Sequence, residues 1–230
     1  MIKDNIIIVE KEIKASLDKA GRECDAAKLI AVSKTKPVEL LKEAYDAGMR
    51  DFGENKVQEI MDKFEQLPKD IRWHMIGHLQ TNKVKYIVDK VYLIHSVDSL
   101  KLAKEISKEA LKKNTNVNVL IEVNVADEDS KFGVSVDETE SLIREISALP
   151  AITVKGLMTV APYVENAEEN RPVFKKLKQL FVDIKAKNID NVFMEIMSMG
   201  MSGDYEVAVE EGATYVRVGT KIFGERNYNI

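Results

Sequence analysis

Apolar residues recur along the chain in two alternating patterns. The first stretch, residues 3–20, places Ile6, Val9, Ile13 and Leu17 at helical spacing and predicts a leading amphipathic helix. Beyond it, short apolar runs typical of buried strands alternate with longer amphipathic stretches typical of helices. The predicted strands are 29–33, 51–53, 73–76, 93–96, 117–125, 152–159, 192–198 and 215–218. The predicted helices between them are 37–48, 55–66, 81–89, 98–113, 137–148, 166–187 and 204–212, and a short turn at 220–224 follows.

This alternation favours a parallel sheet with helices outside it. Eight strand–helix units in a chain of 230 residues predict an α/β fold with a single (β/α)8 barrel of the TIM type. We expect one domain over 1–230, in which 1–25 form the leading helix and its connection. A doubly wound open sheet is the main alternative, but it usually carries a glycine-rich phosphate loop after its first strand, and none follows 29–33.

Composition narrows the setting of this domain. The hydrophobic share of 45% is ordinary, and the net charge of −4 gives no general reason to expect nucleic-acid binding. The single cysteine, Cys24, excludes an intramolecular disulfide and is typical of a reducing compartment. No apolar run approaches the roughly 20 residues that span a bilayer, and the run 6–9 is too short for a signal peptide. We therefore expect a cytoplasmic protein with no membrane partner.

Polar residues follow almost every predicted strand. The carboxyl ends of barrel strands meet at one face, where chemistry collects. These ends carry Ser33 and Lys34, Glu54 and Asn55, Gly77 and His78, His95 and Ser96, Asn124, Met158 and Thr159, Ser198, and Arg217. Strand ends meet loops in any protein, so the pattern indicates a binding face without naming its ligand.

Lys34 is the most informative of these residues. It follows the buried run 29–33 and precedes the helix that Pro37 opens. Burial disfavours the ammonium form of lysine, and a neutral amine can attack a carbonyl group to form a Schiff base. The position therefore predicts a reactive amine at the binding face.

A second informative run covers 215–225. Its strand ends near Arg217, and Gly219 and Thr220 then turn into a short helix, where backbone N–H groups and a hydroxyl can hold phosphate. Upstream, Ser202 or Asp204 is either a helix N-cap or a phosphate ligand.

The two runs together predict a ligand with both a carbonyl and a phosphate group. Pyridoxal 5′-phosphate (PLP) fits this description, and so does the phosphosugar substrate of an aldolase. Arg217 favours PLP if it faces the pyridine nitrogen, whereas its simpler interpretation is a salt bridge at the barrel rim.

Several motifs resemble the YggS/PROSC family of PLP homeostasis proteins. The first three are Ala31-Val32-Ser33-Lys34-Thr35-Lys36-Pro37, Phe52-Gly53-Glu54-Asn55 and Trp73-His74-Met75-Ile76-Gly77. The match continues through 79–83, 130–133, 156–158, 198–202 and 216–224. It covers the chain from about residue 28 onward, in the family's order.

The resemblance implies a monomeric barrel similar to the N-terminal domain of alanine racemase. It implies that Lys34 holds PLP as an internal aldimine and that Arg217 faces the pyridine nitrogen. The phosphate-contacting positions are then Ser202, Gly219 and Thr220, Asn55 lies on the cofactor-facing rim, and Met199 and Gly200 line the ring or the phosphate. His78 stands where many members have proline, and Lys131 is a candidate for passing PLP in or out.

The same residues argue against turnover. PLP is the strongest electron sink when its ring nitrogen is protonated, and a cationic arginine cannot accept that proton. Racemisation also needs a base on each face of the substrate. In alanine racemase the second base comes from another domain and a partner subunit, and we expect no such domain because the chain ends soon after Arg217. We therefore expect PLP binding, buffering and transfer to apo-enzymes.

Three alternatives stay open. A small PLP-dependent racemase would need a second base among His78, His95 and Tyr163. A lysine-dependent aldolase would use Lys34 without a cofactor. A metal enzyme would use the histidines near strands three and four, including His74, but no carboxylate cluster completes a ligand set, so we expect no metal.

Overall fold

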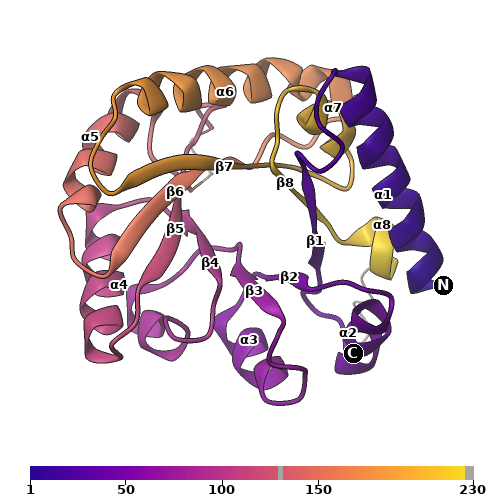
Figure 1. Cartoon of the computed structure of the whole chain (residues 1–230), viewed down its shortest axis with the longest axis horizontal. Coiled ribbons are helices and arrows are strands. Elements are labelled where there is room, and N and C mark those ends of the chain that lie inside the picture. The colour runs from indigo at the N-terminus through magenta and orange to yellow at the C-terminus, as the bar shows by residue number, and fades with distance from the viewer. Residues whose placement is uncertain (129–131, 226–230) are drawn as a thin grey trace.

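The strands of the protein close into a ring. The computed structural model describes residues 1–128 and 132–225. The strands are β1 (Lys28–Val32), β2 (Asp51–Glu54), β3 (Arg72–Met75), β4 (Leu93–Val97), β5 (Val117–Glu122), β6 (Ile152–Met158), β7 (Val192–Met201) and β8 (Tyr215–Val218). Each strand pairs in parallel with the next, and β8 pairs with β1, where Ala31 lies opposite Val218. Figure 1 shows this ring with the helices outside it, which confirms the predicted (β/α)8 barrel.

The helices follow the predicted order, with two local differences. They are α1 (Ile2–Lys19), α2 (Val38–Asp46), α3 (Val57–Phe64), η1 (Thr81–Tyr86), α4 (Leu100–Lys112), α5 (Val136–Ser147), η2 (Ala167–Asn170), α6 (Arg171–Ala186), α7 (Tyr205–Glu210) and α8 (Thr220–Phe223). The predicted helix 81–89 is a short 3₁₀ helix, which suffices to bury Val84. The predicted helix 166–187 is divided, because a proline in the first turn of α6 begins the regular α-helix there.

Apolar side chains form two layers. The larger core lies between the strands and the surrounding helices. The smaller one joins residues of five strands inside the ring: Ile30, Leu93, Leu120, Met158 and Tyr215. The interior of the barrel is therefore packed rather than open, and polar groups found inside it need hydrogen-bond partners.

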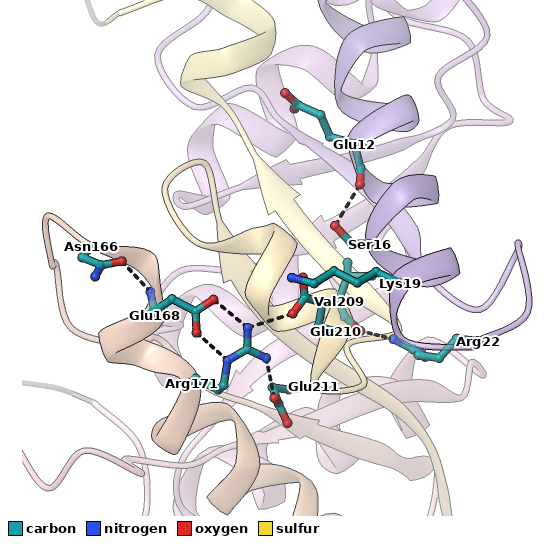
Figure 2. Close-up of polar contacts among 10 residues, drawn as sticks. All are labelled: Glu12, Ser16, Lys19, Arg22, Asn166, Glu168, Arg171, Val209, Glu210 and Glu211. Atoms are coloured by element: carbon teal, nitrogen blue, oxygen red, sulfur yellow. Dashed lines mark hydrogen bonds and ion pairs between the residues drawn. The ribbon is translucent and has the colours of Figure 1, made fainter.

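The leading helix α1 packs against both early and late helices of the chain. Its buried face packs against α2, α7 and α8, and Figure 1 shows α1 beside the last two of these. Polar contacts strengthen the joint (Figure 2), since Lys19 pairs with Glu210 at 2.6 Å and Arg22 donates to the Val209 carbonyl. Arg171 of α6 also pairs with Glu210. Nowhere in 1–128 and 132–225 is there a helix with the length and apolar character that a membrane crossing requires.

Candidate functional site

Lys34 lies two residues beyond β1, at the carboxyl end of the barrel, and its side chain is partly buried. The turn that carries it is unusual, because the next residue, Thr35, has a φ of 63°. A β-branched residue rarely adopts this left-handed conformation, so surrounding contacts must hold the turn.

One side of that turn is fixed by a buried ion pair. The Nζ atom of Lys63 donates to the Ser33 carbonyl at 2.9 Å and to Glu54 Oε1 at 2.7 Å. The Ser33 hydroxyl donates to the same carboxylate oxygen at 2.6 Å. Glu54 is 0% exposed and Lys63 is 6% exposed, so these bonds form in a low-dielectric layer between β2 and α3.

The other side is fixed by Glu59. Its Oε2 atom accepts from the Thr35 backbone N–H at 2.6 Å and from Lys63 at 3.1 Å. The backbone on each side of Lys34 is therefore tied to the same buried lysine. This arrangement supports the left-handed turn and sets the direction from which Lys34 enters the site.

Burial raises the pKa of Glu54 to about 7, against the ammonium group of Lys63 and the hydroxyl of Ser33. Within the described residues, its second oxygen, Oε2, has no hydrogen-bond partner. The carboxyl group thus carries a desolvation cost that its partners only partly offset. Its proton occupancy changes near neutral pH.

The turn after β8 packs directly against β1. A Cβ atom added to Gly219 would lie 3.1 Å from the carbonyl oxygen of Val32, so glycine allows this close approach. Lys36 strengthens the contact by donating to the Phe223 and Gly224 carbonyls at 3.1 and 3.0 Å. The structure therefore brings the Lys34 turn beside Gly219 and Thr220, which the sequence places far away.

Ser202 joins the same turn. Its hydroxyl accepts from the Gly219 backbone N–H at 3.2 Å. It does not cap α7, and neither does the side chain of Asp204, which accepts instead from the Met201 backbone N–H at 2.7 Å. Asp204 is therefore the N-cap residue of α7 by position but makes no side-chain capping bond, and the helix-cap interpretation is wrong for Ser202. Exposed Thr220 completes a small polar turn.

Arg217 projects into the barrel interior from β8 and is 4% exposed. It donates to Ser198 Oγ at 2.6 Å and to the Thr159 carbonyl at 2.8 Å. Burial lowers its pKa to about 10, against the carboxylates of Asp204 and Glu122. It forms no ion pair with any residue of 1–128 and 132–225, so a rim salt bridge within these ranges is not its role. The two bonds use only part of its five N–H donors.

Comparisons with known proteins identify the family of this chain. The model of the family "Alanine racemase, N-terminal domain" matches residues 8–227. A pyridoxal phosphate homeostasis protein of Aquifex aeolicus is 49% identical over 221 residues, which are 96% of each chain. The chain belongs to the YggS/PROSC family of PLP homeostasis proteins.

Solved structures support the fold of this family member. PipY of Synechococcus elongatus, solved with PLP bound, has a TM-score of 0.82 at 32% identity, over 97% of this chain and 100% of that chain. An alanine racemase of Clostridium difficile has a TM-score of 0.76 at 16% identity, over 98% of this chain and 58% of that chain. The second likeness shows the fold alone, and it confirms the predicted similarity to the N-terminal barrel of alanine racemase.

The remaining residues predicted from the YggS/PROSC resemblance lie in different surroundings. Asn55 is at the carboxyl rim and lines a cavity of about 630 Å³ together with His78. Met199 is 0% exposed within the outer core, so any contact with a ligand would come from its main chain. Gly200 has a φ of 88°, and a Cβ there would lie 2.5 Å from Ala208 Cβ, so glycine lets α7 pack against β7.

The candidate bases of a racemase are not gathered at one point. Tyr163 is 97% exposed, and His95 is 0% exposed inside the barrel. His78 lies at the rim, 3.6 Å from Asp98, with its ring stacked on Phe132.

Two further expectations from the sequence concern a metal ion and Lys131. In the described ranges, no group of three His, Cys, Asp or Glu side chains is arranged to hold a metal ion. Lys131 lies outside the described residues.

Sequence reasoning missed Glu122, a buried carboxylate at the end of β5. It placed Glu54 at a strand end but assigned that residue no role. Burial raises the pKa of Glu122 to about 7, the carboxylate of Asp98 adds to this rise, and Arg217 opposes it. A glutamate that ends an otherwise apolar strand, as in Val-Leu-Ile-Glu, is the signal that could have found it.

Proposed function

We propose that this protein binds PLP through a Schiff base between the Lys34 amine and the cofactor's aldehyde carbon, formed with loss of water. The Gly219 turn supplies the phosphate site through its backbone, Ser202 and Thr220. We expect Arg217 to face the pyridine nitrogen. The observation that carries the proposal is the contact of Gly219 with Val32, because it brings the phosphate turn beside the Lys34 turn.

The residues present suit this cofactor. A backbone turn with adjacent hydroxyls suits a phosphate group, and a side chain at Gly219 would crowd the Val32 backbone. Arg217 is held by Ser198 and Thr159 with donors to spare. The related protein PipY has been solved with PLP bound, which supports the same ligand here.

The role we infer is binding, buffering and transfer of PLP, with little or no catalysis. PLP supplies an electron sink that is strongest with a protonated ring nitrogen. Arg217 keeps a pKa of about 10, so at neutral pH it is a cation that donates hydrogen bonds and accepts no proton. It therefore favours the neutral pyridine, and relatives named homeostasis proteins agree with such a role.

The proposal includes the cellular setting. We infer a cytoplasmic monomer that exchanges PLP with apo PLP-dependent enzymes. The single cysteine, which is exposed, agrees with a reducing compartment. Sedimentation of the holo-protein tests the monomer, and activation of an apo-enzyme across a dialysis membrane separates direct transfer from release into solution.

Absorbance of the purified protein tests the PLP proposal most directly. We expect a yellow protein whose visible band shifts on borohydride reduction and is absent in Lys34→Ala. Lys42→Ala, which removes an exposed lysine of the neighbouring α2, is the matched control and should keep the band. A wild-type protein that stays colourless after incubation with PLP and removal of the unbound cofactor would favour a cofactor-free aldolase. An unchanged band in Lys34→Ala would disprove the assigned lysine.

Turnover is tested separately. Holo-protein incubated with single L-amino acids in deuterated water should show no D-isomer and negligible exchange of the α-hydrogen. Robust exchange that disappears in Lys34→Ala would establish a racemase and overturn the non-catalytic role.

A further inference from the structure

A continuous polar chain crosses the interior of the barrel from Arg217. Ser198 Oγ, which accepts from Arg217, lies 2.9 Å from His95 Nδ1. His95 Nε2 lies 2.9 Å from His74 Nδ1, and His74 Nε2 lies 2.9 Å from Asp51 Oδ1. Both histidines and the serine are 0% exposed. The line runs through β8, β7, β4, β3 and β2, between the carboxyl and amino ends of the barrel.

The two ends of the chain fix the direction of every bond. Arginine can only donate, so Ser198 accepts from Arg217 and its own hydrogen is available for His95. At the far end, burial would raise the pKa of Asp51, but hydrogen bonds from Arg72 and His74 outweigh burial and lower it to about 2. An ionised Asp51 can only accept, so His74 Nε2 must carry a hydrogen.

If both imidazoles are neutral, only one choice of tautomers satisfies all of these hydrogen bonds. His74 with hydrogen on Nε2 accepts at Nδ1, so His95 donates from Nε2 and accepts at Nδ1 from the Ser198 hydroxyl. Every polar atom of the line then has a partner, and all donors point from Arg217 toward Asp51. The tautomers follow from the charges at the ends.

The surroundings favour this neutral state. Burial lowers the pKa of His74, although Asp51 opposes the shift, and burial lowers the pKa of His95 further. The groups that face the two rings are Asp51 from β2, Arg72 from β3, Tyr92 before β4, and Arg217 and Tyr215 from β8. Of these, only Asp51 favours a charged imidazole.

A proton added to His74 would reverse the donor direction of the hydrogen bonds between His74, His95 and Ser198. His74 would then donate from both nitrogens, and His95 would accept at Nε2 and donate from Nδ1 toward Ser198. The Ser198 oxygen would accept twice, and its hydrogen would lose the acceptor that it has in the neutral state. The neutral arrangement avoids this cost in the buried interior.

We propose that Ser198, His95 and His74 are positioning residues for Arg217, with both imidazoles neutral and protonated at Nε2. Their hydrogen bonds all point from Arg217 toward ionised Asp51, so Ser198 presents an acceptor oxygen to Arg217. This fixed acceptor holds the guanidinium in one orientation. The consequence for PLP rests on the function proposed above, whereas the tautomers do not depend on any ligand.

Nitrogen NMR of the ¹⁵N-histidine-labelled apo-protein tests the tautomers. We expect His74 and His95 to show Nε2–H signals and signals of an unprotonated Nδ1 from pH 5.5 to 8. A signal from Nδ1–H or from imidazolium at either buried ring at pH 7 would overturn the proposal, whatever the protein binds.

Variants test the coupling to Arg217. Ser198→Ala should convert His95 to a mixture of tautomers, weaken PLP binding about tenfold or more and shift the visible band. Asp51→Asn should disturb the same His95 signals from the opposite end of the line. Tyr215→Phe, whose ring packs on both imidazoles at 5.4 and 6.3 Å, is the matched control and should leave the signals and the band unchanged.

Two outcomes separate the hypotheses. If Ser198→Ala and Asp51→Asn fold but leave the His95 signals and the PLP band as in wild type, the positioning role is wrong. If the tautomers are as expected but no PLP band appears in wild-type protein, the proposed function fails and the polar line stands.

Discussion

Replacing Lys63 by methionine should destabilise the protein in a strongly pH-dependent way. Lys63 is the cation that holds Glu54 and Glu59 beneath the Lys34 turn. Methionine fills a similar volume but leaves the fully buried Glu54 with only the Ser33 hydroxyl as a partner. Removing one member of a buried ion pair is costly because the other charge stays desolvated, unless that group takes up a proton.

The magnitude follows from the pKa of Glu54. Its value of about 7 in the folded protein, against 4.5 ordinarily, means that the folded chain binds a proton that the unfolded chain releases over this interval. The unfolding free energy contributed by Glu54 therefore falls as the pH rises from 4.5 to about 7. Without Lys63 the folded pKa rises further, so this fall continues above pH 7, at up to about 1.4 kcal/mol per pH unit.

Urea unfolding monitored by the single buried tryptophan, Trp73, measures the effect. We expect Lys63→Met to lower the free energy of unfolding by about 1 kcal/mol at pH 6, the value of a lost hydrogen bond, and by about 3 kcal/mol or more at pH 9. Lys69→Met removes an exposed lysine that pairs with Glu65 and should cost under about 0.5 kcal/mol at either pH. A deficit of Lys63→Met that is equal at pH 6 and pH 9, or one that adding Glu54→Gln does not flatten, would refute the reasoning.

Other predictions address packing and accessibility. Gly156→Ala should prevent folding, because the new Cβ would lie 1.8 Å from the Ile196 carbonyl oxygen. Gly21→Ala has open space around it and should cost only about 1–2 kcal/mol of unfolding free energy, because residue 21 has a φ of 64°. Soluble yield and thermal unfolding distinguish the two variants. Phe174→Ala, at a fully buried site between α6 and the sheet, should lower the unfolding free energy by about 3–5 kcal/mol in urea titrations. Exposed Cys24 lines a cavity with Lys28 and Arg72, the first residues of β1 and β3, and so lies at the amino ends of these strands. It should react quickly with a thiol reagent in the folded protein without loss of PLP binding; slow reaction, or release of PLP, would contradict this placement.

The barrel was predictable because its signals are local and repeated. Each strand is a short apolar run, each helix has its own period, and the alternation of the two leaves few topologies. The extension of β7 to Met201 was not predictable in this way. A bulge between Ser198 and Met201 continues the strand through Ser198 and Gly200, which interrupt the apolar run and favour a loop in a pattern of hydrophobicity.

The candidate site was predictable only in part, for a related reason. Lys34 and Arg217 stand at strand ends, where barrel geometry alone makes them candidates. The Ser198–His95 contact joins residues 103 positions apart, and the sequence does not show which nitrogen faces which oxygen. The histidines therefore appeared as possible bases or metal ligands, although two of them are buried members of one hydrogen-bonded line.

The pairing of β1 with β8 has a consequence for how the protein matures. This pairing joins the first and last strands, so closing the ring orders nearly the whole chain between them and makes it one of the least local contacts of the fold. Lys34 follows β1, and Arg217 and Gly219 belong to β8 and its following turn. During synthesis, β1 and the Lys34 turn emerge early and β8 emerges late. A partly made chain therefore has the Lys34 amine without Arg217 and the Gly219 turn, so the PLP site proposed above would be complete only after ring closure.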